Sequence, residues 1–260
     1  MAYSSSVIIG TLNEGPLHQA LKAQYARRYA ASSLTSSEVQ VGDYVADVIG
    51  DNQVLYEIQT GGFGAIRRKL EHLVTEHKVV LVHPIAAVRV IVKVRDATDA
   101  RTTRRRSPKR GHPAHLLNQL VYIPRLLAHP NFELEVVMVE EDELRVFDPK
   151  RVRRRGGWRV LRRQLVAVGE RHRFQCLDDL FDLLKVPLPD PFTTRELADA
   201  LGQPRRLAQK MAYILRKGEV TQVCGKTGNA LVYRRADSRS IPAGRNPPRS
   251  ARTTVRLRGA

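Results

Sequence analysis

The chain has 260 residues, which is long enough for one large domain or two ordinary ones that each bury a core. Its 44 lysines and arginines against 26 aspartates and glutamates give a formal net charge of +18, and this excess predicts a polyanionic partner. An aromatic content of 6% argues against a protein that binds single strands mainly by stacking their bases.

No segment approaches the roughly 18 consecutive apolar residues that a membrane-spanning helix needs. The first residues lack the basic flank and the long apolar run of a signal peptide. The two cysteines, Cys176 and Cys224, are far apart and have no metal-ligand spacing, as in proteins of a reducing compartment. We therefore expect a cytoplasmic, nucleoid-associated protein without a membrane partner.

Between residues 14 and 29, large apolar or aromatic side chains recur at every fourth position, as an amphipathic helix requires. They are Leu17, Leu21, Tyr25 and Tyr29. Two strands are predicted next, at residues 41–49 and 54–59, and the turn-forming sequence Gly50-Asp51-Asn52 joins them as a hairpin.

A glycine-rich turn at residues 60–64 precedes a predicted helix that places Ile66, Leu70 and Leu73 on one face. The unbroken apolar run at residues 79–82 is typical of a central strand covered on both faces, and residues 88–94 predict a further strand. This order of elements predicts an α/β fold with a mixed β-sheet flanked by helices, in a domain of residues 1–98.

Residues 99–175 are predicted to be a basic connecting region, with a helix at residues 116–127 and a strand at residues 132–139. A first basic cluster has no acidic residue near it and comprises Arg104, Arg105, Arg106, Lys109 and Arg110. A second basic stretch, residues 150–163, carries eight lysines and arginines around Trp158. In so basic a chain, phosphate binding by these clusters is the favoured interpretation, although such clusters are often only solvated loops. Trp158 is expected either to stack on a base or to pack against the protein.

Residues 176–235 resemble the helix-turn-helix of winged-helix domains. A threonine-capped helix ends at Gly202, a second helix runs from Pro204 to Lys217, and two short strands flank a turn. In such domains the second helix enters the major groove of DNA. The residues expected to contact DNA are Arg205, Arg206, Gln209 and Lys210 on that helix and Lys226 on the wing. Protein contacts are the alternative use of such a domain. Residues 236–260, rich in arginine, proline and serine, are predicted to form a disordered tail.

Two acidic residues lie late in the strands of the predicted hairpin, where pairing of the strands would bring Asp47 close to Glu57. Paired carboxylates at a strand end are suited to bind a divalent ion, which in turn activates water and stabilises a phosphodiester leaving group. A single Asp–Glu pair near strand ends is nevertheless more often solvated than catalytic.

Asp47, followed after nine residues by Glu57-Ile58-Gln59 and then by a helix and a buried strand, resembles the PD-(D/E)XK nuclease superfamily. The resemblance covers about residues 8–95 and implies a restriction-endonuclease-like core. It also implies that Asp47 and Glu57 bind Mg²⁺ or Mn²⁺ and that Glu14 assists, as the helix-borne glutamate of the resolvase-like branch does. Gln59 stands where the superfamily usually has lysine, so it would position water, and Lys69 on the following helix is a candidate for the cationic role.

These features together predict a metal-dependent deoxyribonuclease in DNA processing, repair or defence, held on DNA by a winged helix. Two alternatives remain open: a non-catalytic DNA-binding protein whose nuclease fold has decayed at Gln59, and an RNA-processing factor. A homodimer or a partner protein is also compatible with the sequence.

Overall fold

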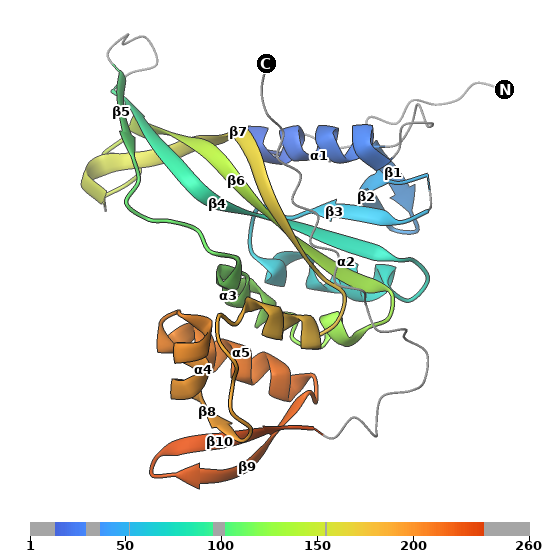
Figure 1. Cartoon of the computed structure of the whole chain (residues 1–260). Coiled ribbons are helices and arrows are strands. Elements are labelled where there is room, and N and C mark those ends of the chain that lie inside the picture. The colour runs from blue at the N-terminus through green and yellow to red at the C-terminus, as the bar shows by residue number, and fades with distance from the viewer. Residues whose placement is uncertain (1–13, 30–36, 52, 96–101, 154, 237–260) are drawn as a thin grey trace, which may run out of the picture.

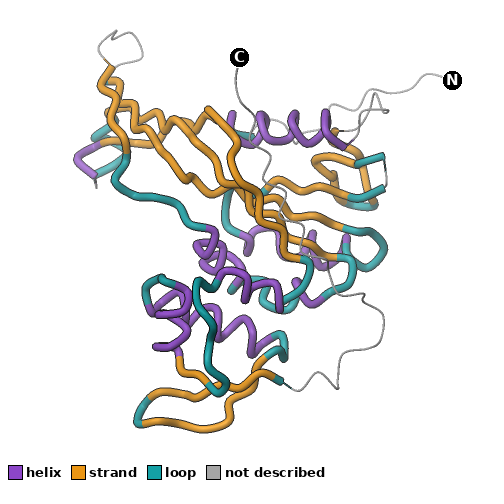
Figure 2. Tube along the Cα trace, viewed as in Figure 1, coloured by secondary structure: helices purple, strands orange, loops and turns teal. Residues whose placement is uncertain are grey.

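The computed structural model describes residues 14–29, 37–51, 53–95, 102–153 and 155–236. In this part of the chain, a seven-stranded mixed sheet carries helices on both faces, and a smaller unit with a three-stranded sheet follows it (Figures 1 and 2). The α/β fold with a mixed sheet flanked by helices is therefore confirmed. The predicted disordered tail lies, from residue 237 onward, outside the described residues.

The large sheet has the order β1-β2-β3-β4-β6-β7, with β5 paired to β4. Its strands are β1 (Ser37–Val41), β2 (Tyr44–Ile49), β3 (Leu55–Ile58), β4 (Val79–Val94), β5 (Thr102–Arg106), β6 (Phe132–Phe147) and β7 (Trp158–Phe174). The β3–β4 and β4–β6 pairs are parallel, and the other neighbours are antiparallel. The predicted hairpin is present as β2 and β3, but Val41 belongs to a separate strand because the chain turns at Gly42, which has a φ of +56°.

The strands predicted at residues 79–82 and 88–94 are one continuous strand, β4, so their division into two strands was wrong. Proline lacks an N–H and usually interrupts a ladder. The Val82 carbonyl accepts a hydrogen bond from the Gln59 N–H, so the backbone of Val82 is directed toward β3. The backbone nitrogen of Pro84, two residues further on, is directed toward β3 as well. Because the β3 ladder ends at the Ile58–Val82 pair, no ladder bond is lost at Pro84.

Residues 99–175, predicted to be a connecting region, supply β5, β6 and β7 to the sheet, so the sheet continues across the predicted boundary at residue 98. Beyond the end of β3 these long strands form an extension that we call the arm (Figure 1). The arm comprises residues 88–94 of β4, all of β5, residues 140–147 of β6 and residues 158–167 of β7.

Helices cover both faces of the sheet (Figure 2). On one face, α1 (Pro16–Tyr29) packs Leu17 and Leu21 against Val82 and Val137. On the other face lie α2 (Arg67–Leu73), α3 (Leu117–Leu120) and short 3₁₀ turns. The helix predicted at residues 116–127 is reduced to α3 and flanking turns, because Pro124 cannot continue a helix.

The C-terminal unit contains α4 (Thr194–Leu201) and α5 (Arg205–Lys217) beside a sheet of order β8-β10-β9. Its strands are β8 (Phe192–Thr193), β9 (Thr221–Thr227) and β10 (Ala230–Arg235). Thr193 and Glu196 form a capping box at the start of α4, and Gly202 ends that helix with a φ of +61°. One hydrophobic cluster includes Leu117 of α3 and Met211 of α5, so the two units share a core. None of the described helices is long and apolar enough to cross a membrane.

Candidate metal centre and nucleic-acid surfaces

The predicted acidic pair lies where β2 and β3 separate. Their ladder consists of the pairs Ile49–Leu55 and Val48–Tyr56, and continuing it by one pair sets Asp47 opposite Glu57. The ladder stops there, because the Ile58 N–H donates to Asp47 Oδ2 over 2.8 Å instead of to the backbone of β2. The separating strand ends therefore hold both carboxylates at one place in the sheet.

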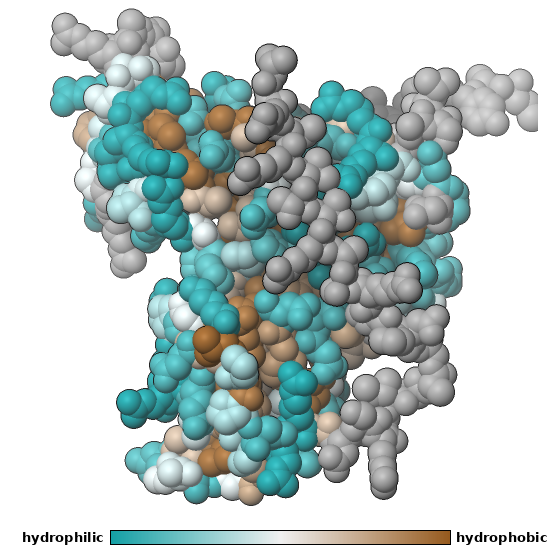
Figure 3. All heavy atoms as spheres, in the orientation of Figure 1, coloured by the Kyte–Doolittle hydropathy of each residue, from teal (hydrophilic) through white to brown (hydrophobic). Residues whose placement is uncertain are grey.

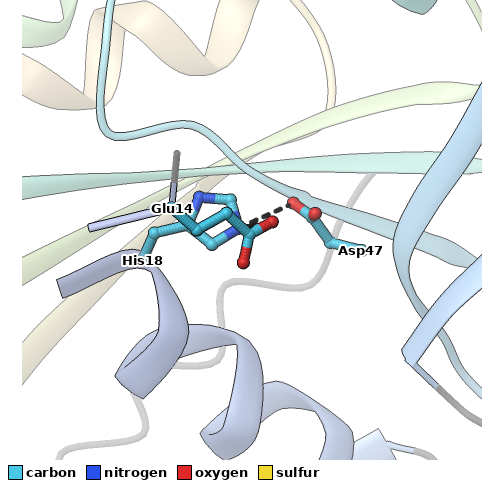
Figure 4. Close-up of side chains that lie close together, drawn as sticks. All are labelled: Glu14, His18 and Asp47. Atoms are coloured by element: carbon cyan, nitrogen blue, oxygen red, sulfur yellow. Dashed lines mark ion pairs between the residues drawn. The ribbon is translucent and has the colours of Figure 1, made fainter. Parts of the chain in front are cut away.

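The start of α1 brings two more ligand-type side chains to Asp47 (Figure 4). His18 Nε2 lies 3.4 Å from Glu14 Oε1 and 3.4 Å from Asp47 Oδ2. One potential ligand atom from each of these three residues falls within 4.8 Å of the others. Glu14 was predicted to assist here and His18 was not. The only sequence signal for His18 is its spacing of four residues from Glu14, which places both on one side of a helix.

A buried lysine compensates part of this negative charge. Lys22 Nζ lies 2.8 Å from Glu38, 3.3 Å from Glu14 and 4.0 Å from Asp47. Burial acts to lower the pKa of Lys22, but the hydrogen bond to Glu38 and the charges of Asp47 and Glu14 outweigh it and raise that pKa. Lys22 therefore remains an ammonium ion.

Glu57 receives its cation from the opposite face of the sheet. Lys69 Nζ, on α2, donates to Glu57 Oε2 over 2.6 Å and to the Val45 carbonyl over 2.7 Å. Glu57 is 4% exposed, and its buried Oε1 has no hydrogen-bond partner among the described residues. Burial and the neighbouring charge of Asp47 raise the pKa of Glu57 to about 7, against the opposing effect of Lys69.

The pKa of Asp47 is shifted in the opposite direction from that of Glu57. Burial acts to raise the pKa of Asp47, but the hydrogen bond and charge of His18 and the Ile58 N–H outweigh it and hold that pKa below its usual value. Burial likewise acts to lower the pKa of His18, and its contacts with Asp47 and Glu14 overcome this and raise it. The site thus pairs a carboxylate that ionises early with one that ionises near neutral pH.

Gln59, predicted to position water, is turned toward the glycine-rich turn. Its Nε2 donates to the Gly62 carbonyl over 2.9 Å, and its backbone N–H donates to Val82. No contact between the Gln59 side chain and either acid occurs among the described residues. The cationic position beside Glu57 is occupied by Lys69, from a different element of the chain.

The donor set fits a divalent cation. Glu14, His18 and Asp47 form the group whose ligand atoms lie together. Glu57 is not a member of that group, but its buried, unpartnered Oε1 is the kind of atom that a cation would satisfy. Mg²⁺ favours oxygen ligands, whereas an imidazole nitrogen such as that of His18 suits a transition metal better. Of the two predicted ions, Mn²⁺ therefore matches these residues more closely.

The first predicted basic cluster lies on the arm. Arg104, Arg105 and Arg106 are exposed on β5, and Arg104 Nη2 pairs with Asp142 at 2.9 Å. Lys109 and Arg110 are exposed in a segment whose backbone is bound to β4: the Ser107 N–H donates to Arg89 and the Gly111 N–H to Ala86. The segment at residues 107–111 is therefore attached to the sheet at both ends.

The predicted DNA-contacting residues of α5 differ in their surroundings. Arg206 and Gln209 are exposed, and Arg205 Nε contacts Thr194 Oγ1 at 3.5 Å. Lys210 is half-buried and donates to Asn118 Oδ1, beside α5 on α3, over 2.8 Å. Lys226 is exposed near the end of β9. Lys210 therefore links the two units and is less accessible than its neighbours.

Comparisons with known proteins identify a family without a known activity. The family described as "Domain of unknown function (DUF8091)" matches residues 15–175, which include α1 and every strand of the large sheet. A protein of Treponema pallidum (strain Nichols), named only as an uncharacterized protein, is 27% identical over 242 residues. That similarity covers 92% of this chain and 93% of the relative, so it includes both units. No solved structure matches the chain.

Proposed function

This chain belongs to the DUF8091 family, and we propose that it is a metal-dependent nuclease that hydrolyses phosphodiester bonds in DNA. The observation that carries the proposal is the position of Asp47 beside Glu57 at the separating ends of β2 and β3. Asp47 also meets Glu14 and His18 there, and Lys69 binds Glu57 from the other face of the sheet. An α/β core with carboxylates at this point is the arrangement expected of a restriction-endonuclease-like enzyme.

In this proposal Asp47 and Glu57 hold the ion, and Glu14 and His18 complete or orient the ligand set. When bound, Mn²⁺ or Mg²⁺ would activate a water and offset the charge of the scissile phosphate. Lys69 holds Glu57 through its 2.6 Å contact and adds a positive charge at the same point. A fixed cation beside the reacting phosphate stabilises charge that develops in the transition state.

We also propose that the C-terminal unit is a winged helix that binds DNA. The order of α4, α5 and the β9–β10 hairpin supports this assignment, as does the exposed stripe formed by Arg206, Gln209, Tyr213 and Arg216 on α5. Residues spaced by three or four positions share one side of a helix, so these side chains would face one groove.

One observation favours a second candidate, a DNA-binding protein without catalysis. Lys22 Nζ already contacts Glu38 and Glu14 and lies 4.0 Å from Asp47. The protein thus places a cation of its own among these acids. However, once His18 and Glu57 have lost their protons, as metal binding requires, Glu14, Glu38, Asp47 and Glu57 bring four negative charges, whereas Lys22 and Lys69 supply two positive charges among the described residues. The remaining negative charge is what a divalent ion would neutralise, and this favours the enzyme.

The test is incubation of the full chain with end-labelled duplex, nicked and single-stranded DNA in Mn²⁺, Mg²⁺ or EDTA. The proposal predicts cleavage that requires a divalent ion and is faster in Mn²⁺, because His18 is a nitrogen donor. Tight DNA binding with no cleavage in either metal would favour the non-catalytic candidate. Equal cleavage in EDTA would exclude a metal site altogether.

A further inference from the structure

One face of the arm continues the face of the sheet that α1 covers. Where the register shifts between β6 and its neighbours, the extra residues lie on β4 and β7. The side chains of β6 therefore alternate regularly between the two faces, and its odd-numbered residues share one face. Val137 and Val139 on that side pack against α1, and Glu141, Glu143 and Arg145 follow beyond the helix. We call this side of the arm its α1 face.

Two buried carboxylates organise arginines from three strands on the α1 face. Glu141 and Glu143 are 3% and 2% exposed. Arg89 Nε contacts Glu141 at 2.6 Å, and Arg145 Nη2 contacts Glu143 at 2.5 Å. Arg163 Nε lies 3.3 Å from Glu143. The arginine side chains are 20–41% exposed, so they lie over the carboxylates and shield them from solvent.

Two further cations share this face. The strand register places Lys93 beside Arg145 and Arg105 beside Ile91, which is itself paired with Glu143. Lys93 Nζ lies 4.4 Å from the ring centre of Trp158, and this fixes the lysine above the strand. The α1 face therefore presents five cations over two buried carboxylates. On the side of the arm seen in the space-filling view, hydrophilic residues predominate, with some hydrophobic residues among them (Figure 3).

The opposite face of the arm is different. Arg104 and Arg106 pair with Val92 and Val90 and so alternate with Arg105 onto that side, where Arg104 is bound to Asp142. Arg162 lies there too, opposite Leu144. The three consecutive arginines of β5 are therefore divided between the two faces, and Arg105 alone among them joins the α1 face.

The arrangement on the α1 face suits phosphates. A guanidinium has five N–H donors, and the carboxylates beneath use only some of them, which leaves donors directed outward. Arginines already held in place lose little side-chain entropy on binding, and their planar fork matches phosphate oxygens. Duplex DNA offers a dense row of such anions, with one charge per roughly 1.7 Å of axis.

The distance between the α1 face of the arm and the acidic site is one that a short DNA duplex can span. Glu57 is level with Leu81 of β4, and Arg89 is eight residues further along the same strand. At about 3.3 Å per residue, the arginines lie roughly 26 Å from the acidic site, which is about eight base pairs of duplex. A duplex of about ten base pairs is therefore long enough to span the distance between the arm and the acidic site.

We propose that the α1 face of the arm binds the phosphate backbone of duplex DNA, with Glu141 and Glu143 as positioning residues for its arginines. The inference rests on the proposed function for the choice of DNA as the polymer. It assigns the contact to the five cations of this face, which are Arg89, Lys93, Arg105, Arg145 and Arg163, and not to the arginines of the opposite face.

The test compares two triple variants that each remove three charges from the arm. One is Lys93→Gln with Arg105→Gln and Arg163→Gln on the α1 face. The matched control is Arg104→Gln with Arg106→Gln and Arg162→Gln on the opposite face. Fluorescence anisotropy with a 40-base-pair duplex in EDTA should show Kd raised about tenfold or more for the first variant and less than about threefold for the control. The slope of log K against log salt should become shallower by roughly 0.9 for each phosphate that the first variant no longer neutralises.

An equal loss of affinity in both variants, or no loss in either, would overturn the inference. Duplex RNA bound more tightly than DNA, with the same dependence on the α1 face, would overturn the choice of DNA. The single change Arg105→Gln guards against misfolding, because Arg105 has no ion pair among the described residues, and it should still weaken binding. Binding in EDTA is independent of cleavage. If the unsubstituted protein binds DNA through the α1 face but never cleaves it, only the proposed nuclease activity is refuted. If it cleaves DNA but its binding does not depend on the α1 face, only this inference is refuted.

Discussion

Asp47 and Glu57 are neighbouring carboxyl groups whose pKa values move in opposite directions. Contacts with His18 and the Ile58 N–H lower the pKa of Asp47 despite its burial, whereas burial and the charge of Asp47 raise that of Glu57 to about 7. Neighbouring groups with diverging pKa values are typical of functional sites, because each can then hold a different protonation state at one pH.

Lys69, rather than Gln59, is expected to carry the cationic role. Lys69→Met should reduce the single-turnover cleavage rate by about 10²–10³-fold, the usual cost of one preorganised electrostatic contact. Gln59→Ala should have a much smaller effect, because the Gln59 amide contacts Gly62 and not the acids. Arg68→Met, one residue away and exposed, is the matched control. A large loss of rate with Gln59→Ala and none with Lys69→Met would reverse this assignment.

Binding of Mn²⁺ is expected to strengthen as the pH rises toward 7. Glu57 must lose its proton to bind the ion, so affinity should fall by up to about tenfold per pH unit below its pKa of about 7. Isothermal titration calorimetry in two buffers of different ionisation enthalpy would measure the proton released. Glu57→Gln should reduce that release to the part contributed by His18, and Glu76→Gln, on an exposed residue, should leave it unchanged.

The raised pKa of Glu57 also affects how the stability of the metal-free protein depends on pH. The folded chain keeps the Glu57 proton at pH values where an unfolded glutamate, with a pKa of 4.5, has lost it. The contribution of Glu57 to stability is therefore complete below pH 4.5 and declines as the pH rises to about 7. A contribution that grew over this range would contradict the raised pKa.

At the level of elements, sequence patterns predicted those helices and turns that depend on residues close together in the chain. The four-residue repeat from Leu17 predicted α1, and Gly50 marked the turn between β2 and β3. Features set by distant partners were not predictable in this way. Pro84 continues a strand only because β3 ends beside it, and His18 joins the site only because α1 crosses β2.

The alternation of β5 illustrates the same limit. Arg104, Arg105 and Arg106 form one cluster in the sequence, but strand geometry sends Arg105 to the face opposite its neighbours. Likewise, residues 99–175 have the composition of a linker because much of β7 is an edge strand with charged, exposed side chains. Their incorporation depends on pairing with β6, which sequence periodicity does not reveal.

Within α5, exposed and interface residues should respond differently to substitution. Arg206→Ala with Arg216→Ala removes two exposed cations and should weaken DNA binding without changing the unfolding temperature. Lys210→Ala breaks the hydrogen bond to Asn118 and should instead cost roughly 0.5–1.5 kcal/mol of stability. Thermal unfolding and anisotropy on the same samples separate the two effects. A stability loss confined to the arginine variant would contradict this division.

For the whole molecule, the shared core means that the C-terminal unit supports the large sheet. Leu117 and Leu120 of α3 belong to the same hydrophobic cluster as Met211 and Leu215 of α5. The similarity to the Treponema pallidum protein likewise spans nearly the full length of both chains. The two units are therefore expected to fold as one body.

A chain that ends at residue 175 should accordingly be destabilised. It would expose buried leucines of α3, each worth about 2–5 kcal/mol when its packing is removed, so the unfolding midpoint should fall by about 10 °C or more. Differential scanning calorimetry of the two lengths measures this directly. An unchanged midpoint would show that the large sheet folds independently of α5.

A comparison of two aspartate variants distinguishes a metal-dependent hydrolytic site at Asp47 from a structural role of that residue. Single-turnover cleavage of labelled DNA in Mn²⁺ is measured for the parent, for Asp47→Asn and for Asp43→Asn. Asp43 is exposed in the turn before β2, so its substitution removes the same charge four residues away. If Asp47 holds the ion, the parent and Asp43→Asn should cleave alike, while Asp47→Asn should bind DNA but cleave it at least about 10²-fold more slowly. Cleavage by Asp47→Asn at the parental rate would contradict this role of Asp47.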